Sequence, residues 1–137
     1  MKKVISYITL AVIDLKKMKQ FYDALDFEVF KQSDDEDHPY IMYKVGAIVL
    51  ALYPKALLAK QSGCSETEFD NKSAMSLSLN VENKTDVDAL LTIVKAQNVT
   101  VKRAGFEPAW GGYCGYFNDP ENNLWEVVWH KNFKFEV

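Results

Sequence analysis

The sequence feature that most limits the possible folds is an internal repeat. Ile8–Val12 (ITLAV) aligns with Leu77–Val81 (LSLNV), and each segment is followed by a stretch with helical periodicity. Later in each half, Ala47–Tyr53 (AIVLALY) aligns with Asn123–Trp129 (NLWEVVW). Two similar halves of this kind can each form a curved sheet, and we expect the two sheets to enclose a cleft for a small ligand.

The first half, about residues 1–53, is expected to contain one helix and four strands. Asp14 is a suitable N-cap, because its carboxylate can accept a hydrogen bond from a free N–H of the first helical turn. The helix would bury an apolar face made of Leu15, Met18, Phe21, Tyr22 and Leu25. Strands are expected at Val4–Val12, Phe27–Lys31, Tyr40–Lys44 and Ala47–Tyr53. The element order is therefore βαβββ.

A polar linker, about residues 54–73, is expected to cross the surface with one helical turn at Lys55–Lys60, before a second half of about residues 74–130. In that half, Asn83 or Thr85 can cap a helix whose apolar face carries Val87, Leu90, Leu91 and Val94. Strands are expected at Met75–Val81, Val99–Lys102, Tyr113–Phe117 and Leu124–Trp129. We therefore predict an α+β fold: one domain, residues 1–137, of two βαβββ modules forming curved mixed sheets around a cleft.

The composition is that of a soluble globular protein. A net charge of −3, with 48% hydrophobic and 26% charged residues, argues against a disordered chain and against a nucleic-acid-binding domain. The apolar run Val45–Tyr53 is too short to span a bilayer as a helix, so no membrane partner is expected. Cys64 and Cys114 form neither a metal-binding spacing nor a disulfide framework, and a cytoplasmic location is the default expectation.

Two segments resemble a known family. They run from Ile8 to Leu25 and from Trp110 to Glu126, and the second contains WGGYCGYFNDP followed by LWE. They are similar to the vicinal oxygen chelate superfamily, which includes glyoxalase I, extradiol dioxygenases and bleomycin-resistance proteins. The resemblance covers nearly the whole chain and implies a fold of paired βαβββ modules. It selects no activity, because this scaffold carries lyases, oxygenases, isomerases and plain binding proteins.

The resemblance also implies where a metal would be bound, since side chains from four strands hold a divalent cation in the metal enzymes of that superfamily. These positions fall on Tyr7, Leu50, Ser76 and Glu126. Transition metals need several His, Asp, Glu or Cys donors, and only Glu126 supplies one, so we expect neither a metal nor another cofactor. His130 lies too far along its strand from Glu126 to share an ion, and His38 is expected in a solvated acidic loop.

Glu126 lies inside the apolar run LWEVVW, where an ionised carboxylate needs a partner. We expect the hydroxyl of Tyr7 or Ser76 to supply it at the floor of the cleft. Two interpretations stay open: Glu126 is a structural group, or it is a polar anchor or general base facing a small ligand. Strand alternation places Trp125 and Trp129 on the other face, under the helices.

Trp110 and Tyr113 are further candidates for ligand contact, because Gly111 and Gly112 between them let backbone or ligand approach closely. Cys114 is expected to be a packed thiol, since the sequence places no histidine to activate it. The predicted ligand-binding residues are Tyr7, Leu50, Ser76, Trp110, Tyr113 and Glu126.

Three functions follow from these residues. The first is metal-free binding of a small planar or cationic molecule, as the bleomycin-resistance branch implies. The second is a metal-independent enzyme with Glu126 as general base, for example in proton abstraction next to a carbonyl. The third, a metal-dependent lyase or dioxygenase, conflicts with Tyr7, Leu50 and Ser76. Whether the chain is an enzyme stays open, and the resemblance implies a homodimer.

Overall fold

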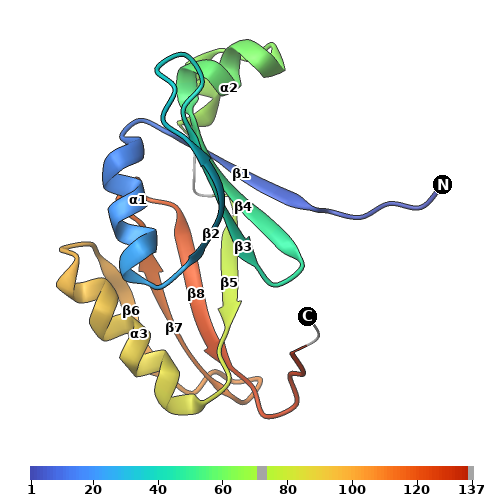
Figure 1. Ribbon diagram of the computed structural model, residues 1–137. Coiled ribbons are helices and arrows are strands. Elements are labelled where there is room, and N and C mark those ends of the chain that lie inside the picture. Colours follow the sequence, from blue (N-terminus) through green and yellow to red (C-terminus); the bar gives the residue numbers. More distant parts are fainter. Residues whose placement is uncertain (71–73, 136–137) are drawn as a thin grey trace. The chain divides into compact units, whose positions relative to one another are not determined.

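The computed structural model describes residues 1–70 and 74–135, so the end of the predicted linker, residues 71–73, lies outside the described residues. Residues 1–70 belong to one compact unit and residues 74–135 to a second, which we call unit 1 and unit 2. Each unit contains a four-stranded mixed sheet, and its four strands and the helix after the first of them follow the order βαβββ along the chain (Figure 1). The predicted fold of paired modules is confirmed in both.

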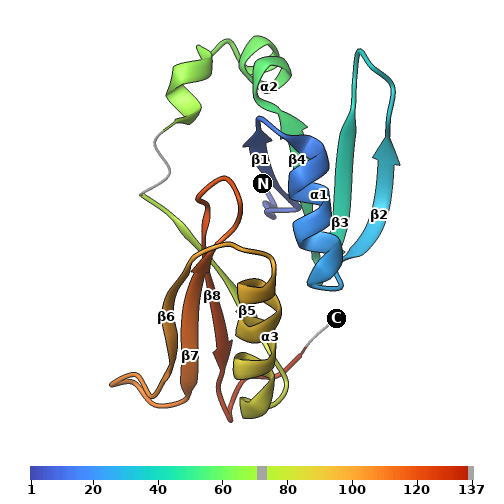
Figure 2. The ribbon, with the colours of Figure 1, turned by 90° about the vertical axis from the view of Figure 1, so that its left-hand side faces the viewer.

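Unit 1 contains β1 (Tyr7–Val12), α1 (Leu15–Ala24), β2 (Glu28–Ser33), β3 (Tyr40–Val45), β4 (Ile48–Pro54), α2 (Lys55–Ser62) and a short 3₁₀ helix, η1 (Glu66–Phe69). The strands are ordered β1-β4-β3-β2, with β1 parallel to β4 and the other pairs antiparallel. Helix α1 lies against one face of this sheet (Figure 2), which we call the helix face.

The packing of α1 follows from its sequence. The Asp14 carboxylate accepts a hydrogen bond from the backbone N–H of Lys17 at 3.0 Å, so the predicted N-cap is confirmed. The apolar stripe of the helix buries Met18, Phe21 and Tyr22. Across the interface lies Tyr43 of β3, whose hydroxyl donates to the Asp23 carboxylate of α1 at 3.0 Å. The helix face is therefore the core of unit 1.

Unit 2 contains β5 (Ser76–Asn80), α3 (Lys84–Ala96), β6 (Val101–Phe106), β7 (Tyr113–Asn118) and β8 (Leu124–Trp129), with strand order β5-β8-β7-β6. Asn83 caps α3, which buries Val87, Leu91 and Val94. A Cβ added to Gly115 on β7 would lie 2.6 Å from Leu91 Cδ1, so the helix approaches the sheet at a residue without a side chain. Trp125 stacks on Phe117 with parallel rings, and both are buried on this side.

Several element boundaries differ from those predicted. Strand β1 begins at Tyr7 rather than Val4, and α2 extends to Ser62 before Gly63 adopts a left-handed conformation. Strand β6 begins at Val101 rather than Val99, because Asn98 turns the chain with a φ of 59° after α3. In the turn between β7 and β8, Asn122 adopts a left-handed conformation with a φ of 67°. Within the described residues, no helix is both long and apolar enough to cross a membrane.

Candidate functional site

The carboxylate of Glu126 lies on the face of the unit 2 sheet opposite α3, which we call the open face. Strand register places Ser78 of β5 and Tyr116 of β7 directly beside Glu126 of β8, and residues paired in this way share a face. The Ser78 hydroxyl donates to Glu126 Oε1 at 2.8 Å, and the Tyr116 hydroxyl donates to Oε2 at 3.0 Å. Both carboxylate oxygens are thus held by hydroxyl donors.

These contacts correct part of the sequence interpretation. The hydroxyl that reaches Glu126 from β5 is that of Ser78. Ser76 instead pairs with Leu124, which lies two residues before Glu126 on β8. Tyr7, the other expected donor, belongs to unit 1. A hydroxyl partner for the carboxylate was correctly expected, but the residue that supplies it was not identified.

Two ionisable neighbours keep their protons because of this environment. Burial raises the pKa of the Cys114 thiol to about 11, with the negative charge of Glu126 and a hydrogen bond to it as further causes. The pKa of the Tyr116 hydroxyl is also raised, chiefly by burial and then by its hydrogen bond to Glu126. Arg103, which pairs with Tyr116 across β6 and β7, opposes both shifts. At neutral pH Cys114 is therefore a protonated, buried thiol rather than a nucleophile.

Leu50 does not lie where the repeat alignment placed it. It pairs with Tyr43 and Ile8, so it faces α1, and its side chain is only 3% exposed. The residue of unit 1 that occupies the place of Glu126 is Ala51, because Ala51 pairs with Thr9 of β1 as Glu126 pairs with Ser78 of β5. A shift of one residue along a strand exchanges its two faces, and this explains the error.

Tyr113 and Trp110 were both predicted to contact the ligand. Tyr113 pairs with Trp129, and its hydroxyl donates to Asp88 of α3 at 2.9 Å, so it lies on the helix face of unit 2 rather than beside Glu126. Trp110 is 55% exposed, with its ring 5.7 Å from that of His130. The close approach expected at the glycines is real but internal: a Cβ on Gly112 would lie 2.7 Å from the Trp110 ring.

The open face of unit 1 carries a cavity of about 440 Å³. Its floor is Ala51, which lies in register between Thr9 of β1 and Met42 of β3. A small residue between larger ones leaves a depression in the sheet surface. We call it the aromatic hollow, and it is lined by Tyr7, Thr9, His38, Tyr40, Met42, Ala51, Tyr53, Leu58 and Gln61.

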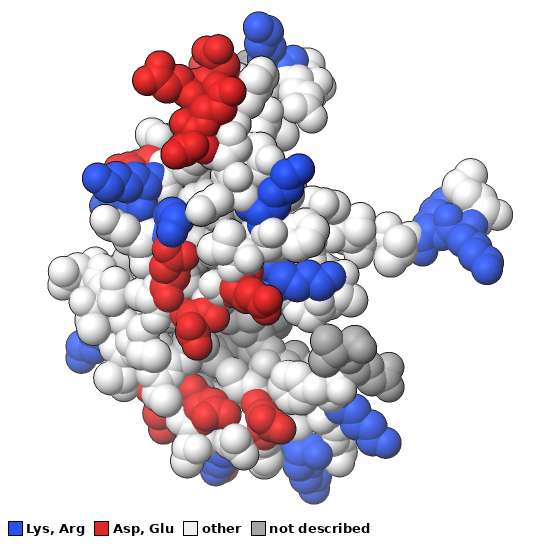
Figure 3. Space-filling view, viewed as in Figure 1, with Lys and Arg blue, Asp and Glu red and all other residues white. Residues whose placement is uncertain are grey.

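The aromatic hollow lies next to a strongly acidic loop. Among the described residues that line it, none is Lys, Arg, Asp or Glu. His38 belongs to the loop between β2 and β3, which also carries Asp34, Asp35, Glu36 and Asp37, and acidic side chains gather at the top of Figure 3. The hollow therefore combines aromatic walls with a nearby negative charge, which favours organic cations over anions.

The donor set does not fit the metal centre that the resemblance implies. On the open face of unit 1 the corresponding positions hold Tyr7, Thr9 and Ala51, and in unit 2 they hold Ser76, Ser78 and Glu126. Only one of these side chains is a carboxylate, and none is an imidazole or a thiol. Within residues 1–70 and 74–135, no three His, Cys, Asp or Glu side chains gather closely enough to hold an ion.

Sequence reasoning missed most of the aromatic hollow. Of its lining residues only Tyr7 was predicted as a ligand contact, and His38 was interpreted as a solvated surface residue. One signal was present: Tyr40 and Met42 alternate with Ile41 and Tyr43 along β3, so the first pair had to face away from the core that the second pair enters. The contribution of α2 through Leu58 and Gln61 had no such signal.

Comparison with known proteins places this geometry in a family. Residues 4–127 match the model of the Glyoxalase/Bleomycin resistance protein/Dioxygenase superfamily. No curated protein matches the sequence. Among solved structures, a glyoxalase-related enzyme from Fulvimarina pelagi superposes with a TM-score of 0.83 at 25% identity, over 94% of this chain and 89% of that one.

Two more distant structures share the fold alone. A lactoylglutathione lyase from Agrobacterium tumefaciens is 21% identical, with a TM-score of 0.69 over 99% of this chain and 100% of the other. A fosfomycin resistance protein from Listeria monocytogenes is 19% identical, with a TM-score of 0.72 over 96% and 97% of the two chains.

Proposed function

The chain belongs to the Glyoxalase/Bleomycin resistance protein/Dioxygenase superfamily, and we propose that it binds a small aromatic or cationic molecule in the aromatic hollow without using a metal. The observation that carries this proposal is the lining of the hollow, in which Tyr7, Tyr40 and Tyr53 surround the alanine floor. The fold alone does not decide the function, since lyases and resistance proteins share it.

Size and chemistry both support this ligand class. A cavity of about 440 Å³ suits a small organic molecule. The tyrosine rings can attract a positive charge through their π faces, and the methyl and thioether groups of Ala51 and Met42 can contact an apolar body. The hydroxyl of Thr9 and the amide of Gln61 can fix the orientation of a polar substituent.

A thermal-shift and calorimetric titration with matched probes tests the proposal. Phenyltrimethylammonium combines a ring with a cation, and choline can be compared with its neutral isostere 3,3-dimethylbutanol. We expect saturable binding of phenyltrimethylammonium by metal-free protein, and choline should bind more tightly than the isostere by roughly 3- to 30-fold, the range of a cation–π contribution. The absence of saturable binding of any of these probes would contradict the proposal.

Variants of the hollow locate the binding. Ala51→Leu fills the floor with three additional carbon atoms and should abolish binding, and Tyr40→Leu should weaken the binding of cations more than that of neutral probes. Lys44→Leu is a matched control, because Lys44 shares the open face through its pairing with Val49 but does not line the hollow. An unchanged affinity in Ala51→Leu would mean that the probes bind elsewhere.

A second candidate function rests on Glu126. Two hydroxyl donors fix its carboxylate on the open face of unit 2, and a carboxylate has lone pairs left to accept a proton. It would then act as a general base, abstracting a proton next to a carbonyl. Glu126→Gln keeps the shape of the side chain and removes its basicity, so it should abolish turnover but leave binding in the aromatic hollow unchanged. Equal rates for the variant and the wild type would exclude this role.

The proposal has two further parts: family membership supports a homodimer, and the lack of a disulfide framework in the sequence favours a cytoplasmic location. Sedimentation equilibrium tests the first, with a mass of twice 15.7 kDa expected. A mass of one chain at micromolar concentration would contradict it.

A further inference from the structure

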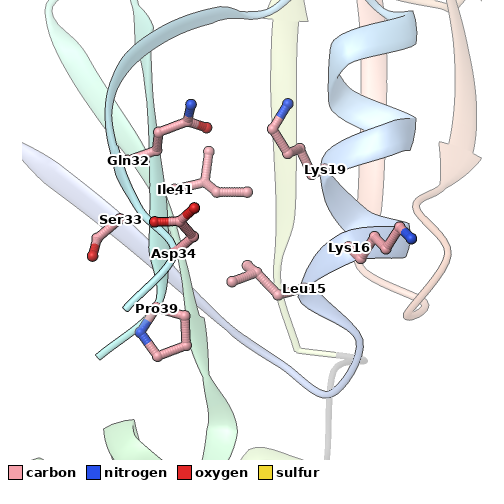
Figure 4. Close-up of a pocket in the computed structure, with 8 residues that line it drawn as sticks. All are labelled: Leu15, Lys16, Lys19, Gln32, Ser33, Asp34, Pro39 and Ile41. Carbon is pink, nitrogen blue, oxygen red and sulfur yellow. The ribbon is translucent and has the colours of Figure 1, made fainter. Parts of the chain in front are cut away.

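The unit 1 sheet carries a second hollow on its opposite side. It has a volume of about 680 Å³ and lies between α1 and the hairpin formed by β2 and β3 (Figure 4). We call it the helix-side hollow, and it is lined by Leu15, Lys16, Lys19, Gln32, Ser33, Asp34, Pro39 and Ile41.

Strand alternation separates this hollow from the aromatic one. Ile41 pairs with Leu52 and faces α1, whereas its neighbours Tyr40 and Met42 line the aromatic hollow. The loop between β2 and β3 contributes to both, with Asp34 in the helix-side hollow and His38 in the aromatic hollow. The two cavities are therefore distinct sites, and a variant in one of them can leave the other unchanged.

The helix-side hollow has an apolar base. Ile41 is 5% exposed, and Leu15 and Pro39 are half-buried beside it. Figure 4 shows Leu15 projecting from α1 into the space in front of Ile41, with Pro39 at the hairpin side. An aliphatic or aromatic side chain placed here would leave water for an apolar surface.

Opposite charges stand on the two walls of the hollow. The carboxylate of Asp34 projects into the space from the hairpin, and Lys19 rises from α1 across from Gln32, while the ammonium group of Lys16 points away (Figure 4). Lys19 pairs with Asp23 on its own helix, but an ammonium group has three N–H donors and can also bond to a second carboxylate.

We propose that the helix-side hollow binds a zwitterion with an apolar side chain, either an amino acid or a short peptide. The ammonium group of the ligand lies at Asp34, its carboxylate lies at Lys19, and its side chain contacts Leu15 and Ile41. The amide of Gln32 and the hydroxyl of Ser33 supply further hydrogen bonds.

Ligands with a single charge fit this arrangement less well. An anion bound to Lys19 would lie near Asp34 and the acidic residues that follow it, and a cation bound to Asp34 would lie near Lys19. A zwitterion places each of its charges beside the opposite one. Because the ligand carries no net charge, its affinity should depend only weakly on salt.

Amide chemical-shift mapping on the full chain tests the proposal. Free leucine, free phenylalanine and the dipeptide of two leucines are titrated, together with N-acetylleucine, which lacks the ammonium group, and leucine amide, which lacks the carboxylate. We expect shifts centred on Leu15, Lys19 and Asp34, with both blocked compounds at least about tenfold weaker than leucine. If the dipeptide binds more tightly than leucine, the hollow is a peptide site. If leucine binds more tightly than the dipeptide, it is an amino-acid site.

Matched variants determine which charge holds which group. Asp34→Asn should weaken the binding of leucine at least about tenfold but leave the affinity for N-acetylleucine unchanged, because that compound has no ammonium group to lose its partner. Lys19→Gln should likewise weaken the binding of leucine at least about tenfold but leave the affinity for leucine amide unchanged. Glu36→Gln and Lys17→Gln remove the same charges from the same loop and helix outside the hollow, and should change affinity less than about twofold. Equal losses in Asp34→Asn and Glu36→Gln would overturn the proposal, as would shifts that appear only in the aromatic hollow or no shifts at all.

The outcome is independent of the proposed function. Ala51→Leu fills the aromatic hollow and should leave leucine binding intact, whereas Lys19→Gln, on α1 and outside the aromatic hollow, should leave binding of phenyltrimethylammonium intact. Loss of both ligands in either variant would show a single site and would contradict the assignment of two.

Discussion

Replacing Leu50 with alanine tests whether this residue lies in the core beneath α1 or on the open face of the sheet, where the repeat alignment placed it. In the structure Leu50 lies beneath α1, 3% exposed and paired with Tyr43 and Ile8. Leu50→Ala would remove three buried carbon atoms and leave a cavity in the core, so the free energy of unfolding should fall by about 2–5 kcal/mol. A residue facing a ligand on the open face would lose far less stability, and its replacement would change binding instead.

Urea unfolding followed by circular dichroism measures this loss, and hydrogen exchange of the β4 amides locates it in unit 1. A local measurement is useful because Trp110, Trp125 and Trp129 all lie in unit 2, so tryptophan fluorescence reports mainly on that unit. Thr9→Ala, on the open face, is the control and should cost less than about 1 kcal/mol. A loss below about 1 kcal/mol in Leu50→Ala, with weakened probe binding, would refute the strand register used here.

Three further predictions concern unit 2 and the thiols. Asp119 is buried and accepts hydrogen bonds from the backbone N–H groups of Glu121 and Asn123 and from the Asn123 side chain, so Asp119→Ala should cost about 3 kcal/mol in urea unfolding; a change below about 1 kcal/mol would contradict this. At pH 8 a thiol reagent should modify only Cys64 in the native chain, because Cys114 is buried; rapid reaction of two thiols without denaturant would show the packing to be wrong. Since the folded chain raises the pKa of Cys114 from 9.0 to about 11, it keeps a proton that the unfolded chain releases, and this stabilisation is present below pH 9 and lost as the pH rises through about 11. Cys114→Ala should therefore show a smaller loss of stability between pH 9 and pH 11 than the wild type, and parallel curves would contradict the assignment.

The sequence allowed the elements and their repeat to be predicted because periodicity is strong in this chain. The helix after Asp14 carries an apolar stripe and a capping carboxylate, and the structure has both. The strand LWEVVW matches β8 to the residue. Boundaries set by a single backbone turn, such as that at Asn98, could not be located from the apolar pattern.

The face of β4 could not be read from its sequence. Residues 47–53, AIVLALY, are apolar throughout, so they lack the alternation that marks the buried side of a half-exposed strand. Alignment with the second half therefore placed Leu50 as the counterpart of Glu126, whereas the pairing with β1 selects Ala51. Tyr113 presented a different difficulty, since its orientation depends on Asp88, a residue far from it in sequence.

The account depends most on the claim that a small molecule binds above Ala51. The most direct test is the dissociation constant of phenyltrimethylammonium for the wild type and for Ala51→Leu, both dialysed against a chelator. We predict saturable binding by the wild type and a loss of at least about tenfold in the variant, with the thermal midpoint of the unliganded protein little changed. Equal dissociation constants for the two proteins, or binding that appears only when a divalent metal is added back, would contradict the account.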